Sequence, residues 1–85
     1  MKEKNTDLLW PLLKDLAASL EVEVRIDNLG EMSGGLCKLN GKSVMLLDKK
    51  LNTAGRNFYL GKALQSLDWE DKYLLPAVRD FLQRI

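Results

Sequence analysis

The chain has no histidine, and Cys37 is the only cysteine among its 85 residues. Without an imidazole, this chain cannot assemble a serine–histidine–aspartate or cysteine–histidine catalytic arrangement, or a helical HExxH zinc site. A single cysteine also excludes a disulfide within the chain. No phosphate-binding loop of the Walker or GxGxxG type follows a predicted strand. We therefore expect no catalytic residues, no metal ligands and no cofactor, and we expect that the protein is not an enzyme.

The sequence also lacks an excess of one charge and any long apolar run. The formal net charge is +1, although 29% of the residues are charged. Dedicated DNA-binding proteins usually carry a basic excess, so this balance argues against nucleic acid as a partner. The apolar runs are too short to span a membrane, and no signal-peptide core follows the first residues. Together with the lone thiol, these features predict a cytoplasmic protein without membrane contact.

The composition is otherwise that of a globular protein, because 46% of the residues are hydrophobic. The length suits one domain, which we expect to span residues 1–85. A helix is predicted at about 7–20, capped by Thr6 or Asp7, with Pro11 in its first turn. Its apolar side recurs at helical spacing and consists of Leu9, Leu12, Leu13, Leu16 and Leu20.

Two further patterns predict strands. Residues 21–27 alternate between polar and apolar side chains, which is typical of a half-buried antiparallel strand. Asn40-Gly41 separates the apolar segments 36–39 and 42–47, and this dipeptide is the strongest short signal for a β-hairpin. The turn sets a register in which Leu39 faces Lys42, Lys38 faces Ser43, Cys37 faces Val44 and Leu36 faces Met45.

The remaining third of the chain predicts two to three helices. Asn52 or Thr53 would cap the first of them. Asp68 would cap a helical turn or short helix at 69–75, and Pro76 suits the first position of a last helix. The predicted fold class is α+β, with an amino-terminal helix, a three-stranded antiparallel sheet with an Asn-Gly hairpin, and carboxy-terminal helices (α-β-β-β-α-α).

Gly34, Gly35 and Cys37 form one candidate ligand-binding site. Two glycines before a strand can adopt a turn whose successive amides bind an anion, and such a nest would favour a reactive thiolate at Cys37. The alternative is a bulge or tight approach at the start of the strand, with Cys37 as a small core residue on the same face as Val44.

Leu36, Met45 and Leu47 form a candidate interface, because they make the second face of the hairpin more apolar than exposure to water favours. In one interpretation the carboxy-terminal helices cover this face, and in the other it binds a second copy or another protein. We favour a non-enzymatic interaction or scaffold protein that forms a homodimer or binds another protein. The alternative is a thiol-dependent or anion-binding protein centred on the Gly-Gly-Leu-Cys segment.

Four segments resemble a family of small, uncharacterised bacterial proteins: 34–37, 47–49, 63–64 and 73–79. Members of that family carry a GGxC motif at the start of a strand and a Pro-x-x-Arg motif in a closing helix. The resemblance covers roughly residues 20–85. It implies a shared fold and no activity.

The order of elements is also similar to the beginning of ImmA/IrrE-type metallopeptidase domains, in which the helix after the sheet carries HExxH. The matching stretch here is 58–64, which offers no metal ligand at any position. This resemblance implies a related core without the metal, and a fold alone does not restore a function.

Overall fold

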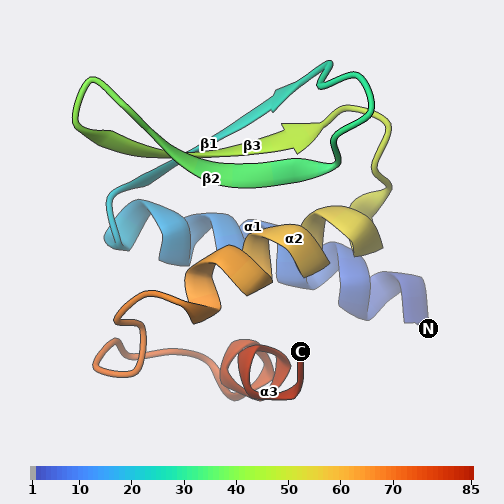
Figure 1. Ribbon diagram of the computed structural model, residues 1–85. Coiled ribbons are helices and arrows are strands. Elements are labelled where there is room, and N and C mark those ends of the chain that lie inside the picture. Colours follow the sequence, from blue (N-terminus) through green and yellow to red (C-terminus); the bar gives the residue numbers. More distant parts are fainter. Residues whose placement is uncertain (1) are drawn as a thin grey trace.

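The structure, a computed structural model, describes residues 2–85, with side chains from Thr6 onward. Its elements are α1 (Lys2–Ser19), β1 (Val22–Asp27), β2 (Gly34–Leu39), β3 (Lys42–Asp48), α2 (Thr53–Gln65) and α3 (Pro76–Arg84). Figure 1 shows the sheet as one layer, α1 and α2 side by side against one face of it, and α3 on the far side of α2. The α+β class and the amino-terminal helix are therefore confirmed.

The sheet is mixed, so the prediction of an antiparallel sheet is wrong for its first strand. The strand order is β1-β3-β2, and β1 runs parallel to β3. This order places the most apolar strand, β3, in the centre, whereas β2 with its two glycines and β1 with its charged residues lie at the edges. Glycine weakens a strand interior, so the middle of a sheet favours β3 over β2.

The Asn-Gly hairpin and its register are confirmed. β2 pairs antiparallel with β3, and all four predicted cross-strand pairs occur, from Leu39 with Lys42 to Leu36 with Met45. Asn40 has a φ of 53° and Gly41 a φ of 81°. Both turn residues thus have the positive φ that a two-residue hairpin turn requires.

The helices cover the face of the sheet that carries Met45 and Leu47. Those two side chains are 2% and 0% exposed, and they belong to the main hydrophobic cluster. The rest of that cluster comes mainly from the helices and comprises Leu13, Leu16, Ala17, Val22, Leu60, Leu64, Trp69, Val78 and Leu82. The face is therefore covered within the chain over its central part, but by the amino-terminal α1 and by α2, whereas the prediction that the carboxy-terminal helices cover it is wrong for α3, which lies beyond α2.

The helix bounds differ from the predictions in two places. α1 begins at Lys2 and continues through Pro11, instead of beginning near residue 7. A proline removes one backbone donor, and packing of the leucine stripe against the sheet compensates for that single loss. Residues 69–75 form no helix, so the carboxy-terminal part has two helices.

Two predicted helix starts are confirmed. Asn52 caps α2, because its Oδ1 accepts a 2.8 Å hydrogen bond from the backbone N–H of Gly55. α3 begins at Pro76, as the fixed φ of proline favours. Within residues 2–85, the longest helix is not apolar enough over sufficient length to cross a membrane.

Candidate interaction surface

The Gly34-Gly35 segment is regular strand rather than a turn. Gly34 pairs with Leu47 and Gly35 with Leu46, and neither glycine has a positive φ. An anion-binding nest needs alternating backbone conformations, so the geometry for the predicted anion site is not formed. Position 34 requires a glycine because the backbones of β2 and β3 approach closely there. A Cβ at this position would lie 2.7 Å from the carbonyl oxygen of Leu46.

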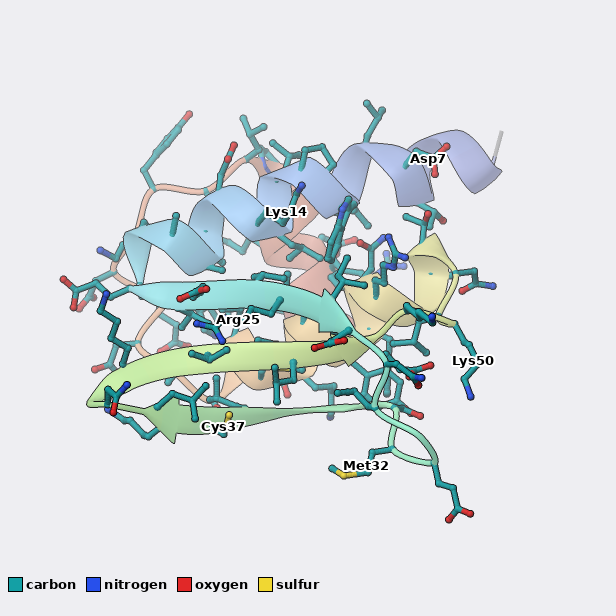
Figure 2. All side chains as sticks on the ribbon, turned by 90° about the horizontal axis from the view of Figure 1, so that it is seen from above. Asp7, Lys14, Arg25, Met32, Cys37 and Lys50 are labelled. Atoms are coloured by element: carbon teal, nitrogen blue, oxygen red, sulfur yellow. The ribbon has the colours of Figure 1, made fainter. Side chains whose placement is uncertain are left out.

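Cys37 lies half-buried on the face of the sheet that no helix covers, and not in the core as its alternative interpretation supposed. Figure 2 looks onto this open face and shows Arg25 of β1 and Cys37 of β2 on it. Arg25 Nε donates a 2.6 Å hydrogen bond to Glu23 Oε2. That bond lowers the pKa of Glu23 and raises the pKa of Arg25. The charged side chains of β1 explain why this face stays in contact with water.

The predicted interface of Leu36, Met45 and Leu47 does not exist as a surface of the folded chain. Met45 and Leu47 are buried beneath α1 and α2, because the apolar side chains of β1 and both helices complete a core around them. Leu36 differs, since it lies on β2 at the margin of the helical layer and is 39% exposed. Of the three predicted interface residues, Leu36 alone remains accessible to a partner.

The outer edge of β2 presents unpaired backbone groups. The N–H of Asp48 donates to the carbonyl of Ser33 at 2.8 Å, which continues the β2–β3 register by one residue. Because hydrogen-bonded residues alternate in an antiparallel pair, Gly35, Cys37 and Leu39 also direct their backbone groups toward β3. The N–H and C=O groups of the alternate residues Gly34, Leu36 and Lys38 therefore point away from the sheet.

Nothing in the described part of the chain covers this edge. No helix, loop or side chain there is hydrogen-bonded to the outward groups of Gly34, Leu36 or Lys38. In Figure 2, α1 extends beyond the outer edge of β1, whereas no helix extends beyond β2. The hairpin register predicted from the sequence already implies that the backbone groups of Gly34, Leu36 and Lys38 point away from β3. The sequence did not show that β2 is an edge strand, so this site was not predicted.

The two edges differ in how they are protected. β1 carries three charged side chains in six residues, namely Glu23, Arg25 and Asp27. Charged side chains are one of the usual means by which proteins prevent a sheet edge from pairing with another chain. β2 has six residues and only one charge, Lys38, and it contains no proline. By this measure β2 is the open edge of the sheet.

A second apolar surface lies between helices and includes no residue of the sheet. A groove of ≈ 540 Å³ runs between α1 and α3, lined by Leu8, Leu9, Pro11, Leu12, Ala77, Asp80, Phe81 and Arg84. Leu8, one of the lining residues, is 64% exposed. Asp80 and Arg84 form an ion pair at 3.1 Å on its rim. The rim thus presents both signs of charge.

A third feature brings together two cations and a ring. Lys14 Nζ lies 5.3 Å from the centre of the Trp10 ring, and Arg56 Cζ lies 6.0 Å from it. The spacing of Trp10 and Lys14 by one helical turn predicts the first contact, but no local signal predicts Arg56. Next to Arg56, Asn57 donates a 2.8 Å hydrogen bond to the carbonyl of Thr6. These contacts join α2 to α1 and serve packing.

Comparison with known proteins finds no matching family model, no matching curated protein and no matching solved structure. Among the side chains of residues 6–85, no three cysteine, aspartate or glutamate groups gather as a metal site would require.

Proposed function

We propose that this chain is a non-catalytic protein-interaction module that binds an extended segment of a protein partner along the free edge of β2. The observation that supports this function is the row of outward backbone groups at Gly34, Leu36 and Lys38. Addition of a strand to an exposed edge is a recurrent mode of peptide recognition, in which backbone hydrogen bonds provide affinity and side-chain contacts provide selectivity.

The side chains of β2 define what such a segment must look like. Leu36 is 39% exposed on the helical side of the edge, so it favours an apolar residue opposite it. Lys38 is the only charged side chain of the strand, and like charges directly opposite are destabilising. The partner strand therefore has an apolar residue opposite Leu36 and no basic residue opposite Lys38.

The proposal is tested by selecting binders from a random library of twelve-residue peptides and measuring their affinity for Lys38→Pro. Proline at position 38 removes an outward N–H and leaves the bonds between β2 and β3 intact, because only the odd-numbered residues of β2 donate to β3. The selected peptides should bind the unmodified chain and lose at least about tenfold in affinity with Lys38→Pro.

Leu39→Lys is the matched control, since Leu39 is 42% exposed on the same strand but directs its backbone groups toward β3. It should retain peptide binding. Circular dichroism checks the fold of each variant, and Leu36→Pro replaces Lys38→Pro if the latter does not fold. If the chain is monomeric at the concentration used for selection, the absence of any enriched peptide would contradict the proposed function, and so would equal binding of the selected peptides to the proline variant.

A further inference from the structure

We infer that the strand bound by the β2 edge is β2 of a second copy of this chain, paired antiparallel about a two-fold axis that passes through Leu36. This inference rests on the proposed function and names its partner. The contact is isologous, because the same residues of each copy meet across the axis. It joins the two sheets into one continuous sheet.

The backbone of β2 matches itself in this register. With the axis at Leu36, Leu36 lies opposite Leu36 of the second copy, and Gly34 lies opposite Lys38. All three residues direct their N–H and C=O groups outward, so each pair exchanges both of its backbone hydrogen bonds. An axis at Gly35 would place Lys38 opposite Met32, and an axis at Cys37 would place Gly34 opposite Asn40, so either would leave an outward-facing residue opposite a position outside β2.

The side chains match as well. The two exposed Leu36 side chains meet on the helical side of the sheet, where each covers the other from water. Lys38 meets Gly34, which has no side chain, so the two lysines are not opposite each other. On the open face, Cys37 lies opposite Gly35, and a Cβ at Gly35 would have no heavy atom within 4 Å in the single chain. That open space leaves room for the thiol.

The overall charge permits the contact. A net charge of +1 gives two copies almost no mutual repulsion, so the local pairing decides whether they associate. An axis at Lys38 would instead place two ammonium groups opposite each other. The register through Leu36 is thus the one that satisfies every outward backbone group of the strand and brings no like charges together.

The test is a charge exchange at the axis, read by sedimentation velocity over a range of concentrations. The unmodified chain should form a dimer. Leu36→Lys and Leu36→Glu should each weaken dimerisation at least about tenfold, because like charges then meet across the axis. A mixture of the two variants should dimerise again, since the charges become complementary. Leu39→Lys, with its backbone directed toward β3, should remain dimeric.

Three results would overturn the inference. The first is a monomer up to about 1 mM, a concentration at which even a contact of about −4 kcal/mol is half formed. The second is a dimer that Leu36→Lys and Leu36→Glu leave intact. The third is a dimer that dissociates in the Leu8→Glu variant and stays intact in the Leu36→Lys variant. That result would place the contact at the groove between α1 and α3.

The failure of this inference is distinguishable from failure of the proposed function. If the chain is monomeric but binds selected peptides in a manner that Lys38→Pro abolishes, the edge recruits a strand from a different protein and the second-copy inference is wrong. If the chain is monomeric and no peptide binds, both are wrong.

Discussion

The carboxylate of Asp48 accepts a 2.8 Å hydrogen bond from the backbone N–H of Leu29, 19 positions earlier in the chain. A second bond of 3.0 Å comes from the N–H of Lys50. Asp48 is 3% exposed at the end of β3. It therefore fixes the loop that joins β1 to β2, and this loop sets where β2 begins.

We expect the stability of the protein to depend on pH through Asp48. The hydrogen bond from Leu29 N–H is the largest cause that lowers the pKa of Asp48 from its ordinary value of 3.8, and burial partly opposes it. A lowered pKa in the folded state means that the carboxylate stabilises the fold above the pKa of the unfolded chain. That contribution is lost as the pH falls through the folded pKa.

Asp48→Asn provides the measurement. Denaturant unfolding between pH 7 and pH 2 should show a smaller acid-induced loss of stability in Asp48→Asn than in the unmodified chain, because asparagine does not titrate. At pH 7 the variant should be the less stable of the two. Equal acid-induced losses in both proteins would contradict the role assigned to Asp48.

The two adjacent glycines of β2 should respond oppositely to alanine. At Gly34 the new Cβ would lie 2.7 Å from the carbonyl oxygen of Leu46, and backbone cannot move aside easily. Gly34→Ala should therefore destabilise by about 1–3 kcal/mol. Gly35 has open space and no positive φ, so Gly35→Ala should be neutral or stabilise by up to about 1 kcal/mol. Equal effects in urea unfolding would show that no close approach exists at Gly34.

A charge at Met45 should disrupt folding, not only association. Met45 is 2% exposed in the core, and a lysine there would leave an ammonium group buried without a partner. Met45→Lys should destabilise by at least about 3 kcal/mol in denaturant unfolding, whereas Leu39→Lys should remain within about 0.5 kcal/mol of the unmodified chain. A folded Met45→Lys variant of undiminished stability would mean that Met45 is at the surface.

These positions also show what the sequence could predict. The Asn40-Gly41 turn is a local signal, and it predicted each cross-strand pair of β2 and β3 because a two-residue turn leaves one register. The alternation in β1 predicted a strand correctly. Alternation does not identify a neighbour, however, and the parallel pairing of Val22 with Ser43 is a contact between distant segments that no local pattern encodes.

The candidate site was harder to predict because it too depends on contacts between segments that are distant in the sequence. Which face of the hairpin the helices cover depends on how much apolar surface β1 adds to each side. Val22 and Val24 add to the face of Met45, while Glu23 and Arg25 lie on the face of Cys37. Once β1 is known to pair with β3, the burial of Met45, the exposure of Cys37 and the free edge of β2 all follow.

The lone thiol offers a direct measure of the register between two copies. With the axis through Leu36, each Cys37 lies opposite Gly35, and the two cysteines are diagonal neighbours with Cα atoms about 7–8 Å apart. A disulfide needs Cα atoms within about 7 Å, so mild oxidation should leave most of the dimer without a disulfide. Because both thiols lie half-buried on the same open face, a short bifunctional maleimide should link the two copies.

A second pair of variants makes this distance test specific. Leu36→Cys combined with Cys37→Ser places two thiols directly opposite each other, with Cα atoms about 5.5 Å apart, so this protein should form an intermolecular disulfide under the same oxidation. Cys37→Ser alone should not be linked by either reagent. Rapid disulfide formation through Cys37 in the unmodified chain would show that the axis passes through Cys37, because only that register brings the two native thiols opposite each other. In that register Lys38 lies opposite Leu36.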